Sequence, residues 1–332
     1  MSLPDEAQGD NAQGGRLAWI VPAAGVAAMA AIVAAATLDR HSLHSTPVSV
    51  EVKLAAGSGG QGAEATPDKA LIEDSPDGPL PVIAADGRQP WQVYARKFDA
   101  AEARPRVALV VGGLGLDNTT TSDAIMRLPP EVTLAFSPYA RDLEGWIAAA
   151  RRAGHEVMLG LPMEPPDYPT QDPGPKTLLT SLEPEKNLER LRWVLSRGTN
   201  YVGLVGIMGG RFATDRASLE PVLEALKSRG LYFIDDHGAQ EGVLAALGPA
   251  LGMAWAITDR HLDREPSQQA IDKSLADLEG VAQQDGAALG LGALYPVTLD
   301  RILAWTGSLQ GKGLALAPAT AVATRQKLPA AQ

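Results

Sequence analysis

Three consecutive residues carry the groups of this sequence that are best suited to acid–base or metal chemistry. Asp235, Asp236 and His237 follow directly after the apolar run 232–234, which is typical of a strand. Two carboxylates beside an imidazole can act as a general base or bind a divalent metal ion. Consecutive residues that leave a strand point in different directions, so we do not expect all three to converge on one ion. The simpler interpretation is that one aspartate caps a helix predicted to begin near residue 239.

Other short motifs do not indicate chemistry of their own. The glycine-rich stretch 112–115 lacks the third glycine of a dinucleotide-binding loop and the Lys-Ser/Thr pair of a phosphate loop. Ser137 has no flanking glycines, so it does not stand in the nucleophile elbow of a serine hydrolase. We interpret His155, at the start of a strand, and His261, in the polar run 259–265, as structural residues.

Alternating strands and helices must position these groups. Strands are predicted at 107–111, 132–136, 156–159, 202–205, 232–234, 254–258, 287–291 and 314–317. Helices are predicted at 122–128, 142–153, 183–197, 215–229, 239–252 and 266–284. Strands separated by helices of this length indicate a parallel sheet with right-handed crossovers, either a barrel or a doubly wound sheet. In both folds, chemistry occurs beyond the carboxyl ends of the strands.

Composition narrows the classes of function. The formal net charge of -10 argues against a nucleic-acid partner, because binding a phosphate backbone normally requires a basic surface. The 332 residues contain no cysteine, which excludes disulfides, a thiol nucleophile and thiolate metal ligands.

The start of the chain predicts a membrane anchor. Residues 1–16 have the composition of a flexible cytoplasmic tail, and residues 17–38 contain no charged side chain. About 22 helical residues would span roughly 33 Å, enough to cross a hydrocarbon core of about 30 Å. A cleaved signal peptide is the alternative, since the three alanines 34–36 resemble a processing site. The acidic tail and the length of the apolar run favour an uncleaved anchor.

A linker is predicted between this anchor and the domain. Residues 39–104 are rich in Ala, Gly, Pro, Ser and Asp, which predicts a disordered segment that buries little apolar surface. Within it, Trp91, Val93 and Tyr94 are interpreted as an edge strand or as a latch that packs on the following domain. Residues 323–332 form a short tail.

The longer motifs, taken in order, resemble one known family. The segments VALVVGGLG, VTLAFSPYA, AGHEVMLGLPMEP, VGLVGIMGGRFATD and RGLYFIDD are similar to those of the divergent polysaccharide deacetylases, relatives of the NodB-type carbohydrate esterases. The resemblance implies a distorted (β/α) barrel of about seven strands over residues 105–322. It also implies a bacterial, envelope-associated protein of carbohydrate metabolism, which agrees with the predicted anchor.

The resemblance further implies a metal site, but its positions in this sequence hold no ligand. The family's first strand ends in two aspartates, one a base and one a metal ligand, where this chain has Gly112 and Gly113. Family histidines correspond to Gly160, Ile207 and Ala293. None of these side chains offers a lone pair or a titratable proton, so we expect neither zinc nor another metal cofactor.

Without the metal ligands, the sequence still predicts a cleft with the framework residues of the family. We expect this cleft to be lined by Gly112, Gly113, Glu164, Met208, Arg211 and Tyr295. Glu164, Arg211 and Tyr295 are suited to hydrogen-bond sugar hydroxyls or a peptide carboxylate, and Tyr295 also offers an apolar ring face. The alternative is that they cap loops and fill the mouth of the barrel.

The sequence therefore predicts a single-pass protein of the bacterial inner membrane with a deacetylase-like domain in the periplasm. We expect this domain to lack metal-dependent hydrolysis and to bind an envelope glycan or a protein partner. The alternative is an active metal-dependent carbohydrate esterase or amidase, with zinc or a similar ion at a site moved to Asp235, Asp236, His237 or Glu164.

Overall fold

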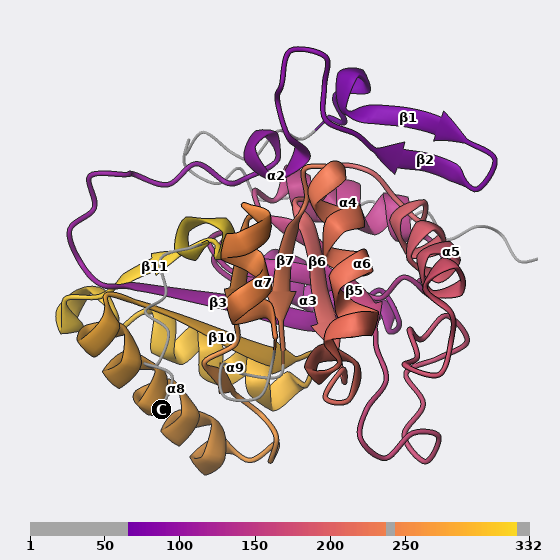
Figure 1. Cartoon of the computed structure of the whole chain (residues 1–332). Helices are drawn as coiled ribbons and strands as arrows, with labels where there is room; N and C mark the ends of the chain where they lie inside the picture. The colour runs from indigo at the N-terminus through magenta and orange to yellow at the C-terminus, as the bar shows by residue number, and fades with distance from the viewer. Residues whose placement is uncertain (1–65, 237–242, 324–332) are drawn as a thin grey trace, which may run out of the picture. The chain divides into compact units, whose positions relative to one another are not determined.

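The centre of the domain is a parallel sheet, shown in Figure 1. The structure, a computed structural model, describes residues 66–236 and 243–323. The sheet has nine strands in the order β8-β7-β6-β5-β4-β3-β10-β9, and β11 pairs with β3. All its strand pairs are parallel. The order begins at β8 and ends at β9, so the described strands form an open half-barrel. The predicted parallel α/β architecture is confirmed, with nine strands instead of about seven.

The elements agree closely with the sequence pattern. The strands of the sheet are β3 (Arg106–Leu114), β4 (Thr133–Phe136), β5 (Val157–Pro162), β6 (Gly203–Ile207), β7 (Tyr232–Asp235), β8 (Trp255–Ile257), β9 (Arg260–His261), β10 (Ala287–Ala293) and β11 (Ala315–Ala317). The helices that follow β3 are α3 (Asn118–Arg127), α4 (Leu143–Arg152), α5 (Pro184–Leu195), α6 (Arg216–Ser228), α7 (Leu244–Leu251), α8 (Gln268–Asp285) and α9 (Pro296–Thr306). The sequence pattern missed β9 and α9.

Strand β3 is buried on both faces. Val107, Leu109 and Val111 belong to the cluster that includes the apolar sides of the helices. Ala108 and Val110 belong to a second cluster, inside the half-barrel. This alternation has the period of two that a strand imposes, and it explains why the run contains no polar residue.

Residues 66–104 are folded, which corrects the prediction of a disordered linker for this part of 39–104. The segment contains η2 (Lys69–Leu71), the hairpin of β1 (Ile72–Ser75) and β2 (Gly78–Pro81), and α2 (Pro90–Val93). Leu71, Leu80 and Tyr94 are buried, and Leu71 and Tyr94 join the cluster inside the half-barrel. The segment has few apolar residues, but it places them where the sheet leaves apolar surface uncovered. The predicted latch at Tyr94 is confirmed, whereas the alternative of an edge strand is wrong.

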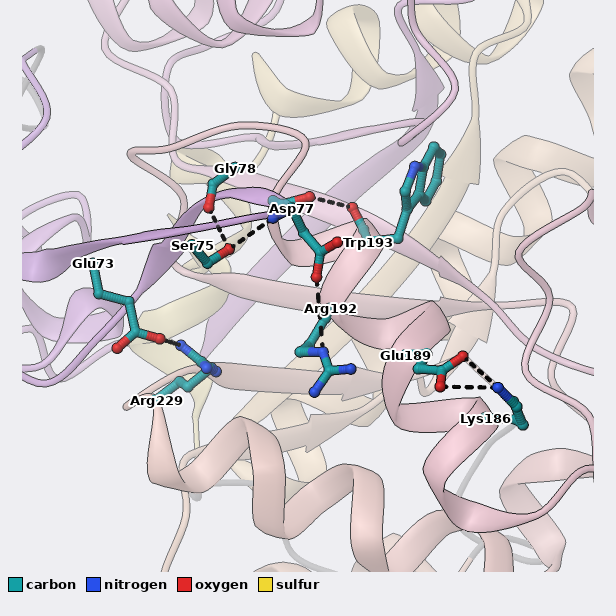
Figure 2. A network of polar contacts seen from close by, with 10 residues as sticks. Glu73, Ser75, Asp77, Gly78, Lys186, Glu189, Arg192, Trp193 and Arg229 are labelled. Atoms are coloured by element: carbon teal, nitrogen blue, oxygen red, sulfur yellow. Dashed lines mark hydrogen bonds and ion pairs between the residues drawn. The ribbon is translucent and has the colours of Figure 1, made fainter.

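Ion pairs accompany the hairpin where it meets the helices, as Figure 2 shows. Arg229 donates to Glu73 and to the carbonyl oxygen of Pro81, both at 2.8 Å. Arg192 lies 3.9 Å from Asp77. Pairs as exposed as these contribute little free energy, so we attribute the docking of the hairpin chiefly to burial of its apolar side chains.

A buried carboxylate joins three distant parts of the chain. Glu156, directly before β5, accepts hydrogen bonds from the backbone N–H of Arg96 at 3.2 Å and of Thr320 at 3.0 Å. Thr133 also donates to it. Burial raises the pKa of Glu156. His155 is buried beside it, with ring nitrogens 2.8 Å from the carbonyl oxygen of Val132 and 3.1 Å from that of Ile125, which confirms its structural role.

The predicted anchor 17–38 lies outside the described residues, together with the tail 1–16, the linker residues 39–65 and the C-terminal residues from 324 on. In the part of the chain that the structure describes, no helix is both long enough and apolar enough to cross a membrane.

Two glycines provide a matched test of the packing between β6 and β7. A Cβ atom at Gly203 would lie 1.8 Å from the carbonyl oxygen of Tyr232, which is part of the neighbouring strand. We expect Gly203→Ala to lower the free energy of unfolding by about 3 kcal/mol or more. Gly280 in α8 has nothing within 4 Å, so Gly280→Ala should raise it by about 0.5–1 kcal/mol. Urea unfolding measures both, and equal stability of the two variants would contradict this packing.

Candidate functional site

A cleft of about 980 Å³ opens where four strands of the sheet end. Its lining includes Gly112 and Gly113 from β3, Ile207 from β6, Asp236 directly after β7, and Ala293 from β10. These positions are at the carboxyl ends of the strands, where ligands of parallel α/β folds bind.

An apolar side chain occupies the space between two positions to which the resemblance assigns the base and a metal ligand. A Cβ atom at Gly160 would lie 3.1 Å from Cγ1 of Ile207, and one at Gly112 would lie 4.0 Å from Cδ1 of the same residue. Gly113 has a φ of +84°, a conformation that residues with a side chain rarely adopt. Among the described residues, no group of three or more histidine, aspartate or glutamate residues is arranged to hold a metal ion. The residues at these family positions therefore do not fit a metal.

Asp236 is a buried carboxylate of the cleft. Its Oδ2 accepts a hydrogen bond from the backbone N–H of Met208 at 2.9 Å, whereas its Oδ1 has no hydrogen-bond partner in the described chain. Burial and, to a lesser extent, the neighbouring Asp235 raise the pKa of Asp236 to about 7. Met208 has a φ of +62°, so this bond fixes a residue whose backbone conformation is unusual for a side chain of its size.

His261 and Asp263 also belong to the cleft lining, and the sequence pattern did not assign them to it. Nε2 of His261 is 2.6 Å from the backbone carbonyl oxygen of Asp236. Oδ2 of Asp263 accepts hydrogen bonds from the N–H of Ala293 at 2.8 Å and from Oγ1 of Thr298 at 2.7 Å. Burial raises the pKa of Asp263. The polar run 259–265 could have indicated them, because β9 within it pairs with β10 and ends at the same edge of the sheet.

Glu164 and Arg211 were predicted to line the cleft, but they form an ion pair outside its lining. Both oxygens of Glu164 are in use: Oε2 accepts from the N–H and Oγ1 of Thr180 at 2.6 and 2.8 Å, and Oε1 lies 3.2 Å from Nη1 of Arg211. The carboxylate thus connects the end of β5 to two loops. This agrees with the alternative that these residues cap loops. Met208 and Tyr295, in contrast, do line the cleft.

The structure does not place both aspartates of the predicted cluster 235–237 in the cleft. Asp235 is fully buried, its carbonyl oxygen accepts from the N–H of Thr258, and it is absent from the cleft lining, which includes Asp236. Neither aspartate caps the helix that follows, because α7 begins at Leu244 with Val243 at its N-cap position and no side-chain hydrogen bond. The capping interpretation is therefore wrong for α7. His237 lies outside the described residues.

Exposed apolar side chains gather at the cleft. Four large apolar side chains are exposed in the described part of the chain: Leu116, Met126, Met208 and Tyr295. All but Met126 line the cleft. Apolar and aromatic surface beside a few polar groups is typical of a ligand-binding site.

An open parallel half-barrel with a cleft at its carboxyl edge defines the class of this domain as a parallel α/β fold. Family comparison agrees: residues 109–323 match the family described as divergent polysaccharide deacetylase. The chain belongs to this family.

Related proteins show how far the similarity extends. The crystal structure of uncharacterized protein ATU2773 from Agrobacterium tumefaciens C58 aligns with a TM-score of 0.71 and 38% identity, over 74% of this chain and 99% of that one. Uncharacterized protein YibQ of Escherichia coli K12 is 24% identical over 203 residues, which are 58% of this chain. The match spans 60% of the Escherichia coli protein.

The raised pKa of Asp236 predicts how the free energy of unfolding depends on pH. A carboxyl group with a pKa near 3.8 in the unfolded chain and about 7 in the folded chain holds its proton more tightly when folded. Its contribution to stability is therefore full below about pH 4 and is lost as the pH rises through about 7, a change on the order of a few kcal/mol. Asp236→Asn should lack this decline.

Urea unfolding of both proteins between about pH 4 and pH 8 measures the difference and cancels the effects of the other buried carboxyl groups. Parallel stability profiles of the wild type and Asp236→Asn would refute the raised pKa.

Proposed function

We propose that this domain is a non-catalytic, glycan-binding member of its family. The observation that carries the proposal is Ile207, whose apolar side chain occupies the space between Gly112 and Gly160. A cation at this place would lose water without gaining ligands, and the family positions at β3 and β10 offer no base that could activate water.

The composition of the cleft supports a carbohydrate as the ligand. A sugar ring has apolar C–H faces and a rim of hydroxyl groups. Tyr295, Met208 and Leu116 offer exposed apolar surface for the faces, and Asp236 and Asp263 offer carboxylate oxygens for hydroxyl groups. A volume of about 980 Å³ is enough for more than a single sugar ring.

The proposed setting is the bacterial envelope. An anchor at residues 17–38 would hold the domain at the inner membrane, on the periplasmic side, where glycan strands and envelope proteins are the available partners. The net charge of -10 favours this setting over a nucleic-acid partner.

Removal of the aromatic ring at the cleft tests glycan binding. Calorimetric titration with soluble N-acetylglucosamine oligosaccharides and peptidoglycan fragments should detect binding to the wild-type chain. Tyr295→Ala should weaken it about tenfold, equivalent to about 1.4 kcal/mol, because a stacking surface is lost. Met126→Ala also removes an exposed apolar side chain, but outside the cleft, and should change the affinity less than about twofold. Equal effects of the two variants would place the glycan elsewhere.

The alternative, an active hydrolase, is favoured by one observation. Asp236 has a pKa of about 7 and lies in a cleft near His261, as a general base would. If the domain is non-catalytic, zinc titration should give no stoichiometric binding, and acetylated oligosaccharides should release no acetate above the rate of the buffer. Acetate release that Asp236→Asn or His261→Ala abolishes would establish the alternative and overturn the proposed function.

A further inference from the structure

We infer that the cleft selects an amino sugar with a free, positively charged amine over the same sugar in its N-acetylated form. This inference rests on the proposed glycan binding and names the ligand class for that site.

The charges that line the cleft are predominantly negative. Among the described residues, three carboxylates belong to the lining, Asp167, Asp236 and Asp263, against one guanidinium, Arg264, and the imidazole of His261. Asp236 and Asp263 are buried, whereas Asp167 and Arg264 are exposed. The deep part of the cleft therefore holds the carboxylates, and the arginine lies where solvent screens it.

Neither buried carboxylate pairs with a lysine or arginine of the described chain. Asp236 takes one hydrogen bond from the N–H of Met208, and Asp263 takes hydrogen bonds from Ala293 and Thr298, all from neutral groups. Oδ1 of Asp236 accepts no hydrogen bond from the described residues, although the residue is buried. A buried carboxylate without a cationic partner is stabilised in its ionised form when a cation enters the cleft beside it.

An ammonium group supplies what this part of the cleft lacks. It carries three N–H donors and a full positive charge, so it can donate to the carboxylates and stabilise their ionised forms. An acetamido group carries one N–H donor and no charge, and its methyl group would displace water from the carboxylates without compensating them. The two forms of the sugar differ only in this group, so the cleft should discriminate between them.

Calorimetry on the full chain in a neutral detergent tests the inference. The probes are a glucosamine tetramer and its fully N-acetylated counterpart, in low salt at about pH 6, where the amines of the tetramer are mostly protonated. We expect the glucosamine tetramer to bind at least about tenfold more tightly. Asp236→Asn and Asp263→Asn should each reduce this preference several-fold. Asp74→Asn, which removes an exposed carboxylate from the hairpin, is the matched control and should leave it unchanged.

The outcomes separate the two proposals. Binding of both tetramers with equal affinity, or with preference for the acetylated form, would overturn the inference and leave the proposed function intact. Failure of both tetramers to bind would instead contradict the proposed function. If Asp263→Asn does not fold, the inference is tested by the preference of Asp236→Asn for the glucosamine tetramer and by the dependence of the wild-type preference on salt. The preference must shrink in Asp236→Asn and when salt is raised to about 0.5 M, since charge attraction is screened. A preference that survives both changes would overturn the inference.

Discussion

Strand β3 has neighbours on every side, and this constraint organises the domain. One edge pairs with β10 over its length, and the other is shared by β11 at the start and β4 at the end. Both faces pack in apolar clusters. A strand enclosed in this way has no room for polar groups until it ends, so the chemistry of this fold is confined to its carboxyl edge. At that edge this chain has Gly112 and Gly113, which leave space for a ligand and supply no reactive group.

The two ends of the half-barrel have different roles. At the amino ends of the strands, residues 66–104 and the C-terminal turn η5 (Ala319–Val322) cover the inner face. Glu156 joins both segments to the sheet through Arg96 and Thr320. The described cleft that is lined by strand ends lies at the opposite, carboxyl edge of the sheet. The folded segment before β3 is thus part of the domain.

The cleft has no metal ligands at the family positions, but carboxylates lie nearby. Ile207 places a methyl group between positions that carry the base and a metal ligand in the family, which makes that region apolar. Carboxylates from the neighbouring strand ends remain nearby, and burial raises the pKa of both Asp236 and Asp263. Such a site is poorly suited to hold a metal at the family positions and well suited to recognise hydroxyl groups or a cation. The proposed binding uses residues other than those at the family's metal positions, so it does not require catalysis.

The sequence by itself determined most of the strands and helices from residue 105 on, because a period of two or of 3.6 is a local property of the chain. The family followed from the resemblance of its longer motifs, taken in order. It also identified Gly113, Gly160, Ile207 and Ala293 as positions without metal ligands. Only the tertiary structure decided which side chains meet. The carboxylate of Glu164 is bonded to Thr180 and Arg211, whereas Asp263, from the polar run 259–265, lines the cleft. The order and register of the strands bring together residues that are far apart in the sequence. This pairing results from burial of the whole sheet, and no local pattern encodes it.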